Sequence, residues 1–359
     1  MFSLNLHDDQ NQLLVPSFPV SDRKELGVRF SHLGITNHFL LSSSGTSGGD
    51  WKGYLISKES LFTNAKAVND KLELTSNDIW GASLPFYHIG GLSIYFRAKL
   101  LNHQPVDLRP WVPEQLVQKI RDHKVSVLSL VPTQIYDLVK LGLEAPKCLR
   151  FILVGGDFLS QELARRFIKL GWPVLRTFGM SEVSSQLCTG MDEKGFYSPL
   201  PIHEIRSDGL NNLFVKSQSF FSYVVQKNAG WELTPLQKLL DPEGFFKLAD
   251  KGIASDEGVK FLGRDDGQIK SSGHLLNLID LKERLDLFCL AHNCWGMMEL
   301  QNTSSEREGQ SLTIHYLESL PKKTVQRFLD EIHPIRIGGL QSHIFFKRTA
   351  LGKFKTQQT

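Results

Sequence analysis

The sequence has little of what marks several broad classes of protein. Its four cysteines, Cys148, Cys188, Cys289 and Cys294, form no CxxC pair, which argues against a disulfide framework or a zinc site. The net charge is only +3 and the basic residues are dispersed, so nucleic-acid binding has no compositional support. No apolar run approaches membrane-spanning length, and the polar start MFSLNLHDDQNQ is unlike a signal peptide. We therefore expect a reduced, cytoplasmic protein without membrane insertion.

From residue 38 onwards, helix-like and strand-like segments alternate, whereas residues 1–37 are only weakly patterned. The clearest helices are SKESLFTNAKAVNDKL, PEQLVQKIRDHK and SQELARRFIKLG, and the clearest strands are VSVLSLV and LRFILVGGD. This alternation predicts an α/β fold with a parallel sheet. After about residue 211, short strands and turns predict a small β subdomain. The charged stretch FLGRDDGQIKSSG then precedes a final α+β unit, so we predict domains at 1–263 and 264–359.

The stretch SSSGTSGGDWKG at 42–53 is the first candidate ligand site. Glycines and hydroxyls after a strand offer backbone N–H and short O–H donors that suit polyphosphate oxygens, and Lys52 would add a positive charge. It is not a Walker loop, because GxxxxGK[ST] is absent. On this stretch alone, a flexible surface loop is an equal alternative.

Three further stretches place polar or aromatic residues and glycines where a predicted strand ends: LPFYHIGGL (84–92), LVGGD (153–157) and TFGMSEV (177–183). Ligands collect at the carboxyl ends of strands in open α/β sheets. Phe178 is suited to stacking on a base, Ser181 to binding a phosphate and Glu182 to holding Mg²⁺. Each stretch taken singly is also explained as a turn, and His88 alone as a structural histidine. Four of them in register favour a nucleotide site.

In this order the segments resemble the adenylate-forming superfamily of acyl- and aryl-CoA synthetases, luciferases and peptide-synthetase adenylation domains. The resemblance is carried by seven segments, which are Ser43–Gly48 with Lys52-Gly53, Tyr87–Gly91, Phe178–Glu182, Asp250, Gly263–Asp266, Ile269–Gly273 and TALGKFK with Lys353. It covers the chain from about residue 38 onwards. It implies an α/β domain followed by a small mobile C-terminal domain that carries the catalytic lysine.

The resemblance also implies roles for individual residues and the use of ATP, Mg²⁺, CoA and a small-molecule carboxylic acid. Lys353, His88 and Glu182 would be catalytic, Glu182 would bind the metal, Asp266 would be the hinge, and Gly273 would contact CoA. The residues implied to bind ATP are Ser43, Ser44, Gly45, Thr46, Ser47, Gly48, Lys52, Gly155, Gly156, Asp157, Phe178, Gly179, Ser181, Asp250 and Arg264. The acid would be bound by His88, Gly90, Gly91 and Arg97.

Several positions depart from the family pattern. Gly49-Asp50-Trp51 replaces x-Pro in the phosphate loop, which places an acidic residue beside the predicted triphosphate site. Leu248-Ala249 replaces Thr-Gly, and Asp280-Leu281-Lys282 replaces Glu-Ile-Glu. The region before the phosphate loop is much shorter than in the family, so the first domain is truncated relative to it. These departures bear on the catalytic rate more than on the fold.

Within the superfamily, HIGGLSIYFRAKL and VSVLSLVPTQIYDLV look like the o-succinylbenzoate–CoA ligases of menaquinone biosynthesis. Arg97 would then meet the second carboxylate of the acid, although a surface charge is the commoner explanation of a helical arginine. Two alternatives stay open: a general acyl- or aryl-CoA synthetase, and a shortened non-catalytic relative that binds nucleotide or a partner protein. A homo-oligomer is also left open.

Overall fold

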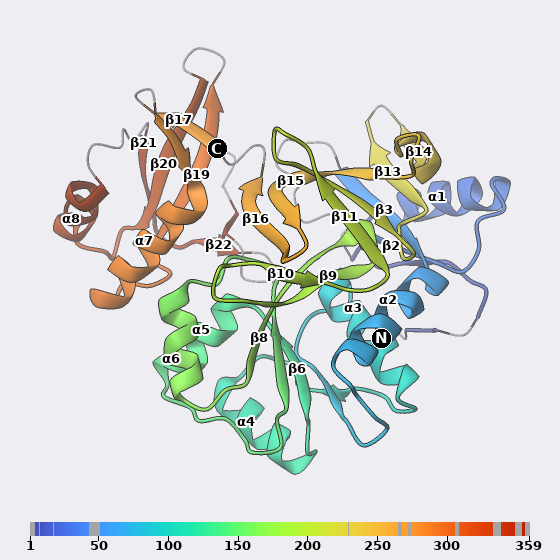
Figure 1. The fold of residues 1–359 in the computed structure, drawn as a ribbon, viewed down its shortest axis with the longest axis horizontal. Coiled ribbons are helices and arrows are strands. Elements are labelled where there is room, and N and C mark those ends of the chain that lie inside the picture. Colours follow the sequence, from blue (N-terminus) through green and yellow to red (C-terminus); the bar gives the residue numbers. More distant parts are fainter. Residues whose placement is uncertain are drawn as a thin grey trace.

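The central element of the fold is a long twisted sheet that is parallel at one end and antiparallel at the other (Figure 1). The computed structural model describes residues 4–6, 8–16, 18–42, 51–228, 230–264, 268–271, 274–305, 309–332, 339–348 and 354–355. Within this described part, eleven strands follow the order β11-β12-β15-β16-β10-β9-β8-β7-β6-β4-β5. The parallel half consists of β4 (Trp80–Ala82), β5 (Val106–Asp107), β6 (Val127–Leu130), β7 (Phe151–Val154) and β8 (Val174–Met180). The predicted parallel α/β sheet is therefore confirmed.

Helices cover both faces of the parallel half, as the buried side chains of its strands require. Leu128 and Leu130 of β6 pack on one face, while Val127 packs on the other. The first face is covered by α4 (Pro113–Asp122), α5 (Pro132–Lys140) and α6 (Gln161–Lys169), and the second by α2 (Lys58–Lys71) and α3 (Ile89–Leu100). Serine caps begin two of these helices, because Ser57 and Ser160 accept hydrogen bonds from the first turns of α2 and α6.

The eight strands from β9 to β16 divide between two sheets. Six strands continue the parallel sheet in antiparallel pairing: β9 (Ser185–Met191), β10 (Tyr197–Pro199), β11 (His203–Ser207), β12 (Asn212–Ser217), β15 (Phe246–Ser255) and β16 (Gly258–Arg264). The other two, β13 (Tyr223–Lys227) and β14 (Trp231–Pro235), join β1 (Gln12–Leu13), β2 (His38–Ser42) and β3 (Trp51–Ser57) in a five-stranded sheet. The 3₁₀ turns η1 (Ser181–Val183) and η2 (Leu236–Lys238) connect these parts.

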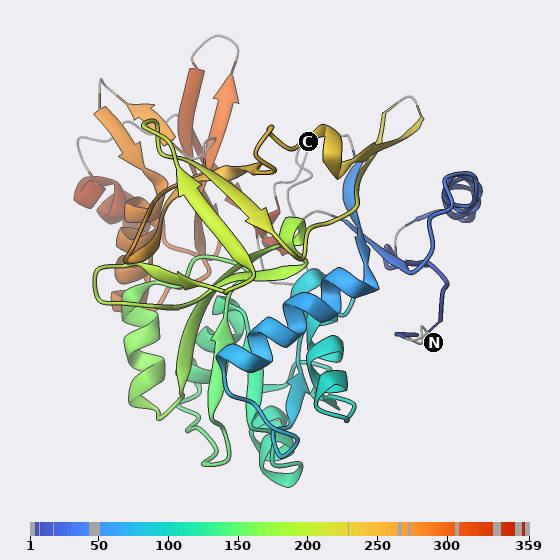
Figure 2. The same cartoon turned by 45° about the vertical axis from the view of Figure 1, so that its right-hand side comes forward.

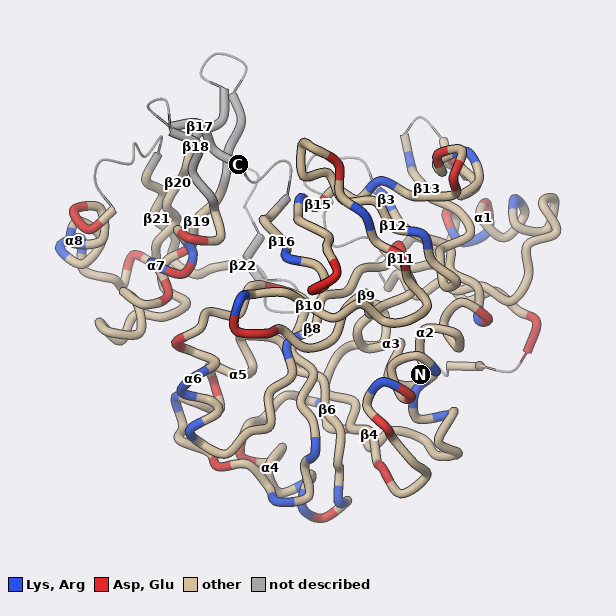
Figure 3. The backbone as a smooth tube through the Cα atoms, in the orientation of Figure 1, with Lys and Arg blue, Asp and Glu red and all other residues tan. Residues whose placement is uncertain are grey.

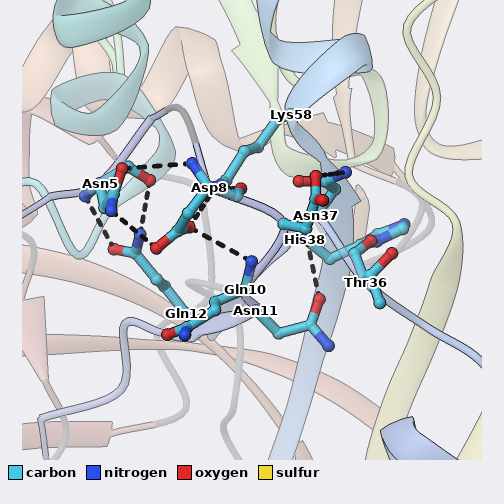
Figure 4. Close-up of polar contacts among 10 residues, drawn as sticks. Asn5, Asp8, Gln10, Asn11, Gln12, Thr36, Asn37, His38 and Lys58 are labelled. Carbon is cyan, nitrogen blue, oxygen red and sulfur yellow. Dashed lines mark hydrogen bonds and ion pairs between the residues drawn. The ribbon is translucent and has the colours of Figure 1, made fainter.

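The N-terminal region, which the sequence left without assigned elements, forms β1 and the helix α1 (Val20–His32). Figure 2 shows α1 at the outer edge of the five-stranded sheet. Leu26 and Phe30 are buried in the same core cluster as Trp231, and Lys227 Nζ lies 2.8 Å from an Asp22 carboxylate oxygen. Lys58 Nζ lies 3.0 Å from Asp8 Oδ1 in the network of Figure 4. These contacts fix Asp8 against α2 and α1 against the five-stranded sheet.

The C-terminal elements form a group with a hydrophobic core of its own (Figure 1). They are β17 (Gln268–Ser271), β18 (His274–Asn277), α7 (Leu278–Ala291), β19 (Met298–Ser305), β20 (Gly309–Leu317), α8 (Lys322–Ile332), β21 (Gly339–His343), β22 (Lys347–Arg348) and β23 (Phe354–Lys355). We call residues 278–332 the C-terminal unit. Its core is consistent with the predicted second domain, while the boundary at 263/264 stays a prediction. No helix of the described residues is long and apolar enough to cross a membrane.

Acidic and basic residues alternate over the described surface elements, as Figure 3 shows for α6 and α7. Along α6, Glu162 is followed by Arg165 and Arg166, and the three side chains form ion pairs of 2.7 and 2.8 Å. Such exposed i,i+3 and i,i+4 pairs stabilise a helix only slightly.

Candidate active site

Three residues from β3 and η1 meet at one corner of the predicted site. The Tyr54 hydroxyl donates a 2.7 Å hydrogen bond to Glu182 Oε1, and Lys52 Nζ lies 5.5 Å from the centre of the Tyr54 ring. Tyr54 is buried, with its ring against Phe221. The Glu182 carboxylate, held by the Tyr54 hydroxyl, is suited to binding a cation, and the nearby Lys52 ammonium group is suited to binding an anion beside it. The sequence predicted Lys52 and Glu182 but missed Tyr54, which an alternating strand pattern marks only as core.

The position of Glu182 is fixed by a buried asparagine that sequence reasoning also missed. Asn64 of α2 donates hydrogen bonds of 3.0 and 2.8 Å to the carbonyl oxygens of Val183 and Gln186. Its own side-chain oxygen accepts from the Gln186 amide at 3.2 Å. Asn64 is fully buried, so these bonds satisfy groups that water cannot reach. The sequence did hold a signal for this role, because Asn64 is a polar residue on the buried face of the amphipathic helix α2.

Close packing explains two of the predicted glycines. A Cβ at Gly155, just after β7, would lie 2.8 Å from Thr177 Oγ1, and one at Gly179 would lie 2.3 Å from the Ser185 carbonyl oxygen. Gly156 has φ of +85°, a conformation that favours glycine. Because β7 and β8 are parallel, their carboxyl ends share one edge of the sheet. The structure therefore brings the 155–157 and 178–182 segments to the same edge, as the sequence predicted.

Two residues predicted to frame the adenine have contacts that restrict this role. Phe178 stacks on Phe261 with ring centroids 3.5 Å apart, so one face of its ring is already covered. Asp157 is exposed, and its Oδ1 accepts a 2.8 Å hydrogen bond from the Phe158 amide. A base would have to use the second face of Phe178.

The second motif forms the start of α3. His88 is the N-cap residue and is half-buried against Tyr87, with ring centroids 4.9 Å apart. A Cβ at Gly91 would lie 2.1 Å from the Pro85 carbonyl oxygen, whereas at Gly90 the nearest atom is 3.7 Å away. Only Gly91 is required by packing. Packing at the start of α3 therefore explains Gly91 of this motif, whether or not the motif also binds the acid as predicted.

Arg97 is not the surface charge that is usual for a helical arginine. It is 3% exposed, packed against the Trp80 ring, with its NH2 group 3.3 Å from Ser185 Oγ and 3.5 Å from Gln186 Oε1. Its Nε has no hydrogen-bond partner, and no carboxylate of the described residues pairs with it. Burial lowers the pKa of its guanidinium to about 9. A buried cation in such surroundings is a candidate anion-binding group.

The predicted ribose pair is brought together by strand register. Asp250 of β15 is the Cα partner of Arg264 at the end of β16. Ser181 begins η1, directly before Glu182. The other predicted site residues lie outside the described residues: Ser43, Ser44, Gly45, Thr46, Ser47, Gly48, Asp266, Gly273 and Lys353.

A magnesium ion fits what the described residues offer. Among them no group of three or more His, Cys, Asp or Glu side chains could hold a metal ion by itself. Mg²⁺ is typically held by one or two carboxylates together with substrate phosphates and water. Glu182, with one oxygen engaged by Tyr54, meets that requirement.

A hollow of about 610 Å³ lies elsewhere, beside His38 and Ser222. It borders the start of β2, whereas the serine-glycine stretch follows the other end of that strand. It contains none of the predicted site residues.

Comparison with known proteins agrees with this geometry. Residues 37–205 match the model of the AMP-binding enzyme family, and this range includes Lys52, His88, Gly155 and Glu182. This segment of the chain is therefore similar to AMP-binding enzymes.

The curated proteins to which the chain is similar include 2-succinylbenzoate–CoA ligases. The ligase of Bacillus cytotoxicus is 32% identical over 152 residues, which are 42% of this chain and 31% of that protein. The ligase of Staphylococcus epidermidis is 27% identical over 244 residues, 65% of this chain and 49% of that protein. The chain thus spans half or less of the length of these curated relatives.

The chain also shares its fold with a solved structure. The O-succinylbenzoate coenzyme A synthetase of Bacillus subtilis, in complex with ATP and magnesium ion, superposes with a TM-score of 0.71 at 20% identity. The similarity covers 88% of this chain and 68% of that one. Over most of its length, the chain therefore shares the α/β fold of that structure.

Proposed function

We propose that the chain is an ATP-dependent acid–CoA ligase that acts on o-succinylbenzoate. In the first half-reaction a carboxylate oxygen of the acid attacks the α-phosphate of ATP, forming an acyl-adenylate and releasing pyrophosphate. In the second, the CoA thiol attacks the acyl carbon and AMP leaves. The family match and the shared edge of the sheet support the reaction class.

The proposed reaction joins two anions, so its chief difficulty is electrostatic. Lys52, with the Ser43–Gly48 loop, would bind the β- and γ-phosphates, and Lys353 would bridge the attacking carboxylate and the α-phosphate. Bound Mg²⁺ would neutralise phosphate charge, and Glu182 with Tyr54 would hold it. Asp250 and Arg264 would position the ribose, and His88 would bound the acyl site. Most of the rate enhancement would then come from positioning and charge stabilisation.

The observation that supports an aromatic dicarboxylic acid is the buried guanidinium of Arg97. A buried charge is costly unless it is paired, and Arg97 has only neutral partners among the described residues. The second carboxylate of o-succinylbenzoate would supply the missing anion. The names of the relatives support the same acid.

Pyrophosphate release tests this proposal directly. The protein is supplied with ATP, Mg²⁺ and one acid at a time: o-succinylbenzoate, benzoate, acetate or a medium-chain fatty acid. We expect a far higher kcat/KM for o-succinylbenzoate than for the three monocarboxylates. Comparable turnover of the fatty acid would indicate a general acyl-CoA synthetase. Binding of ATP without turnover of any acid would indicate a non-catalytic relative.

A further inference from the structure

The C-terminal unit contacts α5 and α6 in the α/β half of the molecule. Trp295, just after α7, stacks on Tyr136 of α5 with ring centroids 4.1 Å apart and planes 14° from parallel. Trp295 also packs against the core of the C-terminal unit, so it bridges the two cores. Leu290 at the end of α7 is buried in the core of the α/β half. Figure 1 shows α7 beside α5 and α6.

A carboxylate of α7 caps the start of α6. Glu283 Oε1 accepts a 2.8 Å hydrogen bond from the backbone N–H of Gln161, the first residue of that helix. An N–H at this position has no acceptor within its own helix, and a negative charge there is favoured by the helix dipole. This bond therefore satisfies a group that would otherwise need water, and it exists only while α7 lies against α6.

Asp286, one turn further along α7, is enclosed at the same contact. The pKa of its carboxyl is raised to about 7, chiefly by burial and also by the nearby carboxylates of Glu299 on β19 and Glu283. The side chains of Ser160 and Trp295 face it and partly oppose this rise. Two more charged groups adjoin Glu283: Arg176 of β8 favours its charged form, and Asp280 disfavours it.

We propose that Glu283, Asp286 and Trp295 form a latch that holds the C-terminal unit against α5 and α6, and that the latch opens as Asp286 loses its proton. The three are positioning residues, since their contacts within the described part of the chain are with α5, α6 and the C-terminal unit and not with predicted site residues. One consequence rests on the proposed function: the latch would set how often the region carrying Lys353 is free to change orientation.

The direction of the pH effect follows from linkage. The pKa of the Asp286 carboxyl is raised in the latched state and ordinary in the open state. At pH values below its ordinary pKa, the carboxyl therefore makes its full contribution to the stability of the latched state. That contribution is lost as the pH rises through the raised value, about 7. The latching equilibrium constant should therefore fall about tenfold between pH 6 and pH 8.

The Gln161 amide gives a direct readout of the latch. Its hydrogen exchange, measured by NMR and corrected for intrinsic rates, should show a protection factor about tenfold lower at pH 8 than at pH 6. Glu283→Ala should remove that protection, whereas the matched variant Asp280→Ala, at an exposed position on the same helix, should keep it. Asp286→Asn, which stays neutral, should make the protection independent of pH. The amide of Ile314, inside the core of the C-terminal unit, reports whether each variant is folded.

Unchanged Gln161 protection in a folded Glu283→Ala variant would overturn the latch. A retained tenfold pH dependence in Asp286→Asn would overturn the role of Asp286. If Glu283→Ala does not fold, Trp295→Phe takes its place, because it weakens the stack on Tyr136 and should lower Gln161 protection at pH 6. This readout requires no substrate, so a failed latch and a failed ligase assignment are distinguishable.

Discussion

The hydroxyl of Tyr54 and the carboxylate of Glu182, 128 residues apart in sequence, share a 2.7 Å hydrogen bond. This bond joins the five-stranded sheet to the end of the parallel sheet. Because β3 begins at Trp51, directly after the Ser43–Gly48 loop and the next two residues in sequence, the bond fixes Glu182 relative to the strand that follows the predicted phosphate loop.

The first prediction concerns this pair. Glu182→Gln keeps the shape but loses the charge that Mg²⁺ requires, so pyrophosphate release should need at least about tenfold more Mg²⁺. Tyr54→Phe should give a smaller shift in the same direction, since Glu182 keeps its charge and loses only the hydrogen bond that orients it. Titration of the rate with Mg²⁺ measures both, with Tyr223→Phe as control. An unchanged titration for Glu182→Gln would remove this residue from the metal site.

The second prediction uses the adjacent glycines of α3. In Gly91→Ala the new methyl would meet the Pro85 carbonyl oxygen, so we expect a loss of about 1–3 kcal/mol in the free energy of unfolding. In Gly90→Ala the nearest atom is 3.7 Å away, and the change should be neutral or stabilising by up to about 1 kcal/mol. Denaturant unfolding of the two variants tests the contrast. Equal stabilities would contradict the packing account of Gly91.

The third prediction concerns the acid. Arg97→Ala, and the similarly long Arg97→Met, should raise KM for o-succinylbenzoate about a hundredfold, as expected for one partner of a buried charge pair. The kcat should change less, because such a group binds ground and transition states alike. Activity with benzoate should stay nearly unchanged and serves as control. An equal loss for both acids would mean that Arg97 is structural.

The fourth prediction concerns Lys353, whose role rests on sequence alone. Lys353→Ala should lower the rate of adenylate formation ~10²–10³-fold, since its charge acts mainly in the transition state. ATP binding, followed by calorimetry, should be nearly intact. Lys355→Ala, two residues on, is the matched control. Adenylate formation at the parent rate would refute the catalytic role.

The fifth prediction concerns pH and stability. His203 is buried between Ser217 Oγ and the Gln186 carbonyl oxygen, and burial lowers its pKa to about 4. The unfolded chain binds the proton more tightly, so the stability that this histidine contributes is full above pH 6.5 and is lost as the pH falls towards 4. The free energy of unfolding should fall by roughly 3 kcal/mol in total, because each unit of difference between the two pKa values is worth about 1.4 kcal/mol. His203→Gln should reduce this slope in urea unfolding between pH 4 and 7. An unchanged slope would contradict the assignment.

Most of the α/β half could be predicted from the sequence, because periodicity and caps determine its helices locally. Ser57 and Ser160 begin α2 and α6 where the sequence placed a serine before an apolar pattern. The site glycines Gly155, Gly156 and Gly179 could also be predicted, because each lies where a recognisable strand pattern ends. Helix α1 was missed for two reasons. Its buried apolar face is narrow, with only Leu26 and Phe30, and the helix begins after Pro19, which provides no side-chain cap.

What the sequence could not show depends on contacts between distant segments. Arg97 gives no local sign of being buried, because its burial comes from Trp80 and from residues near position 185. Tyr54 and Asn64 became site residues only when β3 and α2 met the Glu182 turn. The Asp250 and Arg264 pair likewise depends on the register of two strands.

The dual pairing of β8 has a consequence for how the molecule is assembled. One edge of this strand pairs in parallel with β7, and the other in antiparallel with β9. A shift of β8 by one residue would turn all its side chains to the opposite faces. Such a shift would displace Thr177 from Gly155. Through the pairing with β9, it would also displace Ser185 and Gln186 from Arg97. The two halves of the sheet should therefore form and melt in a single cooperative transition, with β8 as the strand on which both depend.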